Sequence, residues 1–321
     1  MSRKRFSVFI AGHKGMVGSS LCNLFKKKKK FFKIITKEKN KLNLLDQKKV
    51  NEFFKKNKID YLFICAARVG GIYINSIKPA DFIYENLTIS SNLIHASYLG
   101  KVKKVLYLGS SCIYPKNINI PIKENDLLSG ELEKTNEAYA VAKIAGIKLA
   151  QSYNSQYNTD IRCVMPNNLY GPNDNYELKN SHVIAALIRK FHEAKIRNDK
   201  YVTLWGSGKA KREILHVNDL SEFIFKILNI SKKKFLKITK KDCIINLGSG
   251  DELTIKQLAF LIKKIVKYKG LIKFNNNGLD GVMRKALDTR RQKNLNLYPK
   301  ISLKKGIDLS YLDFKNKYEK N

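Results

Sequence analysis

The chain has 321 residues, 44% of them hydrophobic, and carries 62 lysines and arginines against 27 acidic residues, for a formal net charge of +35. No apolar run approaches the roughly 20 residues that span a bilayer, and the N-terminus lacks the apolar stretch of a secretory signal, so we expect a cytoplasmic protein with no membrane partner. Only ten of the basic residues are arginine, the side chain best suited to bidentate phosphate contacts, so the charge favours a solvated lysine surface and no specific nucleic-acid partner.

The cysteines are odd in number and widely separated: Cys22, Cys65, Cys112, Cys163 and Cys243. Such spacing is typical neither of a disulfide framework nor of a metal site, and we expect no metal. It fits a reducing compartment.

The first expected element is a short apolar run at residues 6–11, which predicts a buried parallel strand. Three glycines follow, Gly12, Gly15 and Gly18, and then a helix-like segment. Glycines at this spacing let the backbone turn tightly and approach a pyrophosphate, which rests on the helix N-terminus. A glycine turn is common on its own, but its place between strand and helix favours dinucleotide binding.

The segment after the second expected strand, at residues 32–36, bears on the choice of cofactor. Folds that select NAD place an acidic residue here for the ribose 2′-hydroxyl, whereas folds that select NADP place cations here. Lys37 follows the strand directly and Lys14 lies in the glycine turn, but Glu38 comes next. We expect NADP(H), and Glu38 leaves NAD(H) open.

Up to about residue 165, short apolar runs alternate with longer helical stretches. Strands are expected at residues 6–11, 32–36, 61–66, 105–109 and 162–165, and long helices at 79–100 and 137–157. This alternation predicts an α/β fold with a Rossmann-type doubly wound parallel sheet. Helices at 182–195 and 254–268 stand among loops, so we expect an NADP-binding domain over residues 1–170 and a smaller C-terminal α/β lobe over 171–321.

The second long helix carries Tyr139 and Lys143, and Ser110 follows the fourth strand. Residues four apart share a helix face, so the Lys143 ammonium is expected close to the Tyr139 phenol. A free phenol has a pKa of about 10, which a nearby cation lowers. The set predicts a proton donor beside a reducing cofactor. An ordinary amphipathic pair, and a serine that closes a turn, are the structural alternatives.

Seven further segments carry a family resemblance: AARVGGI (66–72), PADFIYEN (79–86), GSSCIYP (109–115), NEAYAVAKIAG (136–146), NLYGP (168–172), SHV (181–183) and WGSG (205–208). With the glycine turn, they resemble the extended short-chain dehydrogenase/reductase superfamily. The SSC and SHV pieces narrow the resemblance to the GDP-L-fucose synthase family.

The resemblance implies conversion of GDP-4-keto-6-deoxy-D-mannose to GDP-L-fucose by 3,5-epimerisation and then NADPH-dependent 4-keto reduction. It also implies that residues 171–321 bind the substrate and that one of their segments returns to the large sheet. The two long helices are apolar on more than one face, and the resemblance makes them a two-fold homodimer interface. The alternatives are another nucleotide-sugar epimerase or dehydratase of the superfamily, and a basic binding protein that retains the fold.

Residue roles follow from the same resemblance. Ser110, Tyr139 and Lys143 serve the reduction, while Cys112 is the base and His182 the acid of the epimerisation. Substrate contacts are expected from Lys190, Trp205, Arg212 and Asp280. The cofactor set is Gly12, His13, Lys14, Gly15, Met16, Val17, Gly18, Lys37, Asp46, Ala66, Leu108, Gly109, Ser110, Ser111, Tyr139, Lys143, Pro166, Asn167, Asn168, Leu169 and His182.

Structural roles remain open for four of these residues. Free cysteines are usually buried hydrophobes, so Cys112 could be one. A lone histidine such as His182 is often structural, Trp205 could fill the core, and Asp46 could cap a helix.

Overall fold

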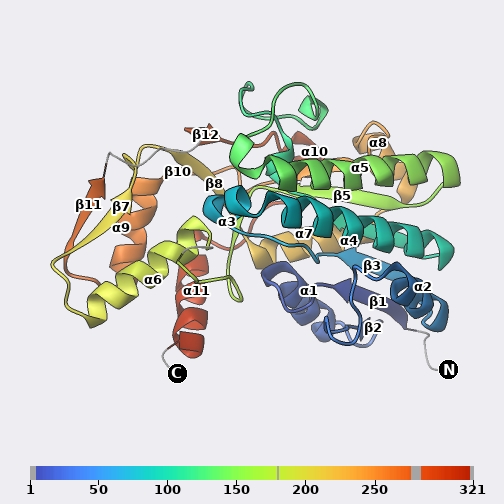
Figure 1. Ribbon diagram of the computed structural model, residues 1–321, viewed down its shortest axis with the longest axis horizontal. Helices are drawn as coiled ribbons and strands as arrows, with labels where there is room; N and C mark the ends of the chain where they lie inside the picture. Colours follow the sequence, from blue (N-terminus) through green and yellow to red (C-terminus); the bar gives the residue numbers. More distant parts are fainter. Residues whose placement is uncertain (1–4, 179–180, 276–282, 319–321) are drawn as a thin grey trace.

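In the computed structural model the chain is described over residues 5–178, 181–275 and 283–318. A six-stranded parallel sheet with flanking helices forms the large lobe, and a second group of helices and short strands forms the small lobe (Figure 1). This architecture confirms the expected fold class.

The large sheet has the strand order β2-β1-β3-β4-β5-β9. The chain runs from β1 outward to β2 and then returns to β3 on the other side of β1, so the topological switch point lies between β1 and β3. The strands are β1 (Phe6–Ala11), β2 (Phe32–Ile35), β3 (Tyr61–Ile64), β4 (Lys104–Leu108), β5 (Ile161–Pro166) and β9 (Ile244–Leu247).

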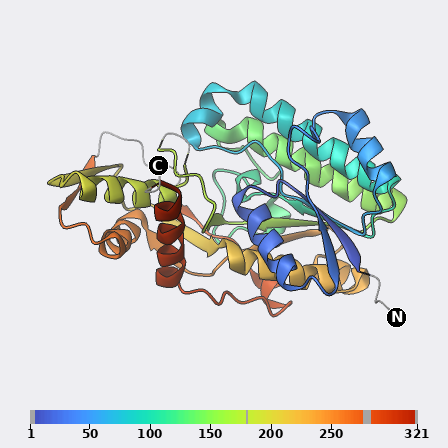
Figure 2. The same cartoon turned by 90° about the horizontal axis from the view of Figure 1, so that it is seen from below.

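Helices cover both faces of this sheet, as Figure 2 shows. On one face α1 packs against α7, and on the other α4 packs against both α2 and α5. Their bounds are α1 (Met16–Lys27), α2 (Gln47–Lys56), α4 (Pro79–Leu99), α5 (Glu137–Tyr157) and α7 (Val217–Asn229); the short α3 (Ile72–Ile77), α8 (Lys232–Ile238) and α10 (Arg290–Lys293) join them. The expected strands and helices are all present, with ends within two residues of those expected.

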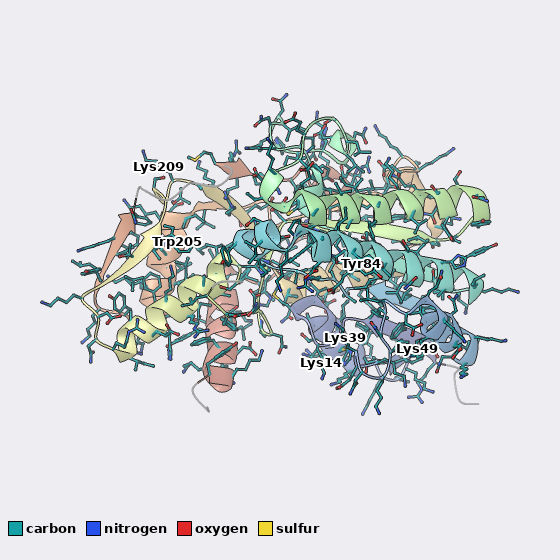
Figure 3. The ribbon with its side chains drawn as sticks, viewed as in Figure 1. Lys14, Lys39, Lys49, Tyr84, Trp205 and Lys209 are labelled. Carbon is teal, nitrogen blue, oxygen red and sulfur yellow. The ribbon has the colours of Figure 1, made fainter. Side chains whose placement is uncertain are left out.

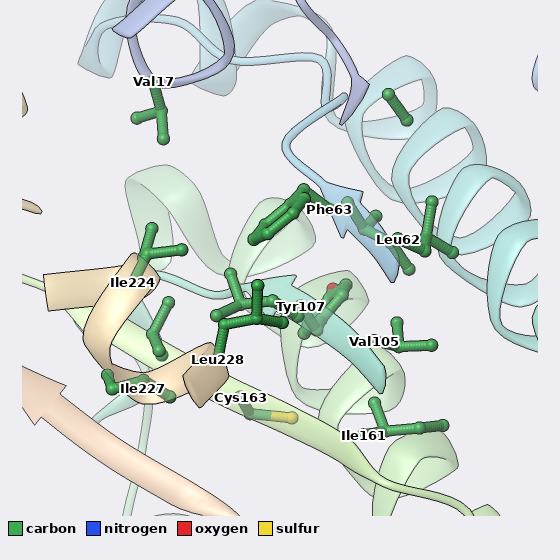
Figure 4. Close-up of a cluster of buried hydrophobic side chains, with 14 of the residues drawn as sticks. Val17, Leu62, Phe63, Val105, Tyr107, Ile161, Cys163, Ile224, Ile227 and Leu228 are labelled. Atoms are coloured by element: carbon green, nitrogen blue, oxygen red, sulfur yellow. The ribbon is translucent and has the colours of Figure 1, made fainter. Parts of the chain in front are cut away.

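The core of the large lobe lies between the sheet and these helices. Figure 4 shows Phe63 of β3 and Tyr107 of β4 beside Ile224 and Leu228 of α7. All four side chains are at most 4% exposed. Strands that are buried on both faces read as continuous apolar runs, which is why the sequence identified them.

Two cations of the sheet, the buried Arg162 and the half-buried Lys104, bind the C-terminal end of α7. The guanidinium of Arg162 on β5 donates to the carbonyls of Ile227 and Ile230, and the Lys104 ammonium donates to Leu228 and Ile230. The last carbonyls of a helix have no partners within it, so cations stabilise this end. Asp160 pairs with Arg162 at 2.7 Å. A helix from the C-terminal half of the chain thereby belongs to the large lobe.

The small lobe has its own apolar core, formed by α6 (Val183–Ile196), α9 (Ile255–Val266) and α11 (Leu303–Tyr318). Strand β7 (Tyr201–Trp205) pairs in parallel with β11 (Leu271–Asn275). A mixed sheet follows the order β10-β8-β12, and β6 also pairs with β8. Its strands are β6 (Asn168–Tyr170), β8 (Lys211–His216), β10 (Glu252–Thr254) and β12 (Arg284–Lys285).

Among the described residues, every helix is too short or too polar to cross a membrane.

Candidate active site

The glycine turn forms a closely packed cradle at the switch point. Gly12 has φ +86°, and a Cβ atom there would lie 2.6 Å from the Ala66 nitrogen. A Cβ on Gly18 would overlap the Gly12 carbonyl oxygen. Gly15 is the N-cap of α1 and has no side chain to occupy the first-turn N–H groups. These groups are therefore available to an anion, so the turn fits a dinucleotide pyrophosphate.

The segment that follows β2, which contains Lys37 and Glu38, contacts the glycine turn. Lys14 pairs with Glu38 at 2.8 Å. The Lys14 hydrogen bond, more than any other influence, lowers the pKa of Glu38. Lys37 instead places its ammonium over the Phe53 ring of α2, 6.0 Å from the ring centre. Asp46 is the N-cap of α2, where its Oδ1 accepts from the Lys49 amide at 3.0 Å.

Ser110, Cys112 and Tyr139 lie together beyond the end of β4. Ser110 caps a short 3₁₀ turn (Ser111–Ile113), and its Oγ accepts from the Cys112 amide at 3.3 Å. Ser110 is also close enough to Tyr139 for its side chain to lower the Tyr139 pKa by hydrogen bonding, and the Cys112 thiol is close enough to raise that pKa electrostatically. One serine thus contacts both the phenol and the segment that holds the thiol.

Lys143 lies on the same helix face as Tyr139 and is 4% exposed. Its ammonium donates to the Leu108 carbonyl at 2.8 Å and lies 5.7 Å from the centre of the Tyr139 ring. Burial lowers the pKa of Lys143 to about 8. Burial also raises the pKa of Tyr139, against a smaller lowering by the Ser110 hydrogen bond. The expected lowering of the Tyr139 pKa by the nearby cation is therefore wrong for this structure, because burial dominates and raises the pKa.

Asn136 is a neighbour of the thiol that the sequence analysis did not assign to the site. It is the N-cap of α5, and its amide nitrogen donates to the Cys112 sulfur at 3.8 Å. Its Oδ1 is buried without a hydrogen-bond partner in the protein. Asn136 lies three residues before Tyr139 in a segment already singled out, but only the fold shows its contact with Cys112.

His182 belongs to a separate cluster at the N-terminus of α6. Its Nδ1 lies 3.4 Å from Oδ1 of Asp174, whose side chain is only 5% exposed. The hydrogen bond to Asp174 outweighs burial and raises the pKa of His182. The other carboxylate oxygen of Asp174 is buried without a partner. No sequence motif pointed to Asp174.

Residues 166–169, expected at the cofactor, run from the last residue of β5 into β6, with Asn167 between the two strands. Asn167 is buried, and its Oδ1 accepts from the Asn168 amide at 3.0 Å while its side-chain nitrogen donates to Glu213. Glu213 is 1% exposed and also accepts from the amides of Gly250 and Leu287. This carboxylate of β8 therefore fixes the segment that leads from one lobe to the other.

The expected substrate residues stand on the small lobe. Figure 3 shows Trp205 on the small lobe. Its side chain is 80% exposed, which excludes a core role, and the Lys190 ammonium lies 5.2 Å from its ring centre. Burial lowers the pKa of Lys190. Arg212 lies on β8 and donates to the Lys211 carbonyl at 2.8 Å. Asp280 lies outside the described residues.

The structure thus brings the predicted residues together in three groups. The cofactor turn and the Ser110 cluster follow β1 and β4 at the same edge of the sheet, because all strands are parallel. His182 with Asp174, and Lys190 with Trp205, come from the small lobe and the segment leading to it.

Comparison with known proteins agrees with this arrangement. Residues 8–248 match the NAD dependent epimerase/dehydratase family. The GDP-L-fucose synthase of Escherichia coli (strain K12) is 47% identical over 97% of this chain and 96% of its own. A GDP-6-OMe-4-keto-L-xylo-heptose reductase from C. jejuni is 36% identical over 98% of each chain, with a TM-score of 0.91. A GDP-mannoheptose C4 reductase from Campylobacter jejuni with NADP bound is 37% identical over 97% of this chain and 98% of its own, with a TM-score of 0.87. The chain belongs to the NAD dependent epimerase/dehydratase family and, within it, to the GDP-L-fucose synthases.

Proposed function

We propose that this chain converts GDP-4-keto-6-deoxy-D-mannose to GDP-L-fucose, by epimerisation at C3 and C5 and then reduction at C4. The observation that carries this proposal is the position of Ser110, whose Oγ accepts from the Cys112 amide at 3.3 Å and whose side chain is close enough to act on the Tyr139 pKa. The turn that Ser110 begins therefore places the Cys112 thiol beside Tyr139, the proton donor of the reduction. The 47% identity to the E. coli enzyme supports the same activity.

NADP(H) fits the glycine cradle, because the Gly12 and Gly18 positions exclude side chains and α1 begins there with uncapped N–H groups. When bound, NADPH supplies the hydride that reduces C4. The lysine of the turn, Lys14, offers a cation for a 2′-phosphate. A relative of known structure holds NADP, which supports this assignment.

In the reduction, Tyr139 donates a proton to the alkoxide that develops at C4, and Ser110 orients the carbonyl. Burial favours the protonated phenol, so Tyr139 carries the proton that it must give. Lys143 then returns a proton to the Tyr139 phenolate, since its lowered pKa lets it exchange protons near neutral pH. Donors placed where charge develops are worth about 3 to 4 kcal/mol each.

In the epimerisation, the thiolate form of Cys112 accepts the proton from C3 or C5, next to the C4 ketone, and protonated His182 donates one to the opposite face. The enolate oxygen that forms between these steps accepts hydrogen bonds from Ser110 and Tyr139. His182 is suited to the acid role because Asp174 favours its protonated form. One carbonyl position thereby serves both reactions.

The GDP part of the substrate is assigned to the small lobe. Arg212 and Lys190 offer cations for the pyrophosphate, and the exposed Trp205 ring offers a flat surface for packing. The role of Asp280 as a ligand of a hydroxyl group stays a prediction.

A homodimer is part of the proposal. Helices α4 and α5 pack side by side, and their outer faces carry the exposed side chains of Tyr84 and Val141. A helix that is apolar on more than one face is expected to bury a second face as well as the one that packs on its own sheet. A second copy of the chain, related by two-fold symmetry, can cover that face.

The test is NADPH oxidation in the presence of GDP-4-keto-6-deoxy-D-mannose, with the product identified by NMR. We expect one NADPH oxidised per sugar and an L-fuco product. Tyr139→Phe should lower the reduction rate about 10²- to 10⁴-fold with NADPH binding retained. A product reduced at C4 without inversion would assign the chain to a C4 reductase instead, and no oxidation would exclude both activities.

A further inference from the structure

Glu38 is placed where the fold recognises the far ribose of a dinucleotide. It lies three residues beyond the end of β2, Ile35, and about 20 residues after the last glycine of the turn, the usual position of an acid that binds a ribose 2′-hydroxyl. Strands β1 and β2 are parallel neighbours, so their following segments open at one edge of the sheet. The contact between Lys14 and Glu38 shows that these segments meet there.

The two residues have opposite preferences for the group at the 2′ position. A carboxylate accepts hydrogen bonds from ribose hydroxyls but repels a phosphate, whereas an ammonium attracts the phosphate. The Lys14 and Glu38 side chains are 71% and 53% exposed, so both are accessible to a ligand. The hydrogen bond from Lys14 lowers the pKa of Glu38 further, so Glu38 is a carboxylate at neutral pH.

Other cations lie near Glu38, but no ion pair with them is found among the described residues, so its partner is Lys14. Lys37, which follows β2 directly, has its ammonium over Phe53 of α2. Lys39 is exposed and lies in the same end of the large lobe as Lys14 in Figure 3. His13 acts on Glu38 only weakly, as the smallest of its electrostatic influences. Lys14, the cation proposed for the 2′-phosphate, therefore already has a carboxylate partner.

We propose that Glu38 is a cofactor-selecting residue: it competes with the 2′-phosphate of NADPH for Lys14 and binds the 2′-hydroxyl of NADH in its place. The chain then uses both cofactors and discriminates between them less than the same site without the carboxylate would. This proposal rests on the dinucleotide part of the proposed function.

The experiment measures the dissociation constants of NADPH and NADH by fluorescence of the reduced nicotinamide, without any sugar substrate. In Glu38→Gln, NADPH should bind about fivefold more tightly, because an exposed ion pair no longer has to be broken and the repulsion is gone. NADH should bind about threefold more weakly, because a charge-assisted hydrogen bond to the ribose is lost. The ratio of the two constants should therefore change by more than tenfold.

The matched control is Glu52→Gln, which removes the same charge from the same lobe. Glu52 is half exposed and pairs with Lys56 within α2, at 4.0 Å. Its substitution should change both constants equally, and by less than twofold. A second variant, Lys14→Met, should weaken NADPH about tenfold, leave NADH nearly unchanged, and abolish the gain of Glu38→Gln when the two are combined.

Two outcomes overturn the proposal. Equal changes for NADPH and NADH in Glu38→Gln, or no change in either constant, would leave the ratio at its wild-type value and show that Glu38 does not discriminate at the 2′ position. Binding of neither cofactor to the wild-type protein would overturn the proposed function as well. Because the measurement needs no sugar, a wrong sugar substrate would leave the result unaffected.

Discussion

His182 is an exposed histidine held by a buried acid. Its imidazole lies 3.4 Å from the Asp174 carboxylate, which is 5% exposed and has one oxygen with no partner in the protein. A buried carboxylate without a cation is costly, and a protonated histidine is the partner that relieves this cost. The pair therefore explains why His182 keeps its proton at higher pH than an ordinary histidine.

Substituting Asp174→Asn tests this account. The pKa of His182 should fall, because its stabilising charge is removed. The acid form is present below the pKa and is lost as pH rises through it, so proton exchange at C3 and C5 should decline at lower pH than in the wild type. At pH 8 the exchange rate should drop about tenfold, within the usual contribution of a positioned acid.

The His182 pKa is measured by NMR titration, and the exchange by deuterium uptake from D₂O. Asp199→Asn is the matched control, since Asp199 pairs with Arg197 at 2.9 Å on the surface. An unchanged His182 pKa in Asp174→Asn would show that the carboxylate has a purely structural role.

At the scale of elements, a buried polar network holds the segment that carries Cys112. The Arg291 guanidinium of α10 lies 3.4 Å from Glu124 and 2.7 Å from Asp242, and it also donates to the Ile244 carbonyl of β9. Glu124 accepts from the amide of Asn246, whose side chain accepts from the Tyr114 hydroxyl. Tyr114 stands two residues after Cys112 in the chain. The network thus joins the thiol segment to the edge of the large sheet.

Arg291→Met should lower the free energy of unfolding by about 3 kcal/mol, because it leaves the buried Glu124 carboxylate and the half-buried Asp242 carboxylate without their cation. Urea denaturation measures the loss. Arg284→Met serves as the control, since Arg284 forms an exposed pair with Glu252, at 2.7 Å, and such pairs contribute about 0 to 1 kcal/mol. Equal losses in the two variants would contradict a stabilising role for the network.

The sequence predicted elements whose signal is local. The inner strands β1, β3, β4 and β5 are largely buried apolar runs, and the spacing of Tyr139 and Lys143 depends only on helix geometry. The sequence did not identify β9, because its four residues resemble any short apolar run. Its partner strand, β5, begins at Ile161 and is therefore far away in the chain. Asp174 and Asn136 were missed for the same reason, since their contacts appear only after distant segments fold together.

At the scale of the whole molecule, the division into residues 1–170 and 171–321 stays a prediction. The large core includes side chains from α7, α8 and β9, all beyond residue 170. Between the lobes, Glu213 binds Asn167 on one side and the Leu287 amide on the other. The chain crosses between lobes more than once, so no composition change marks a boundary.

Association of two copies is the next prediction at this scale. Light scattering at micromolar concentration should give twice the 36.9 kDa mass of the chain. Tyr84→Lys, at an exposed position of α4, should shift the mass toward the monomer, because it places a charge in the proposed apolar interface. Phe260→Lys, at an exposed apolar position of α9, is the control. A wild-type monomer would contradict the homodimer.

The central claim is that one site performs both epimerisation and reduction, with Cys112 as the base of the first step. The most direct measurement compares the wild type with Cys112→Ser in D₂O, with substrate and NADPH, and uses NMR to locate deuterium in the product. The wild type should give an inverted product with deuterium at C3 and C5. Cys112→Ser should still reduce C4 but give an unepimerised sugar with little deuterium, and Cys22→Ser, on the buried face of α1, should match the wild type. Wild-type exchange in Cys112→Ser would contradict the account.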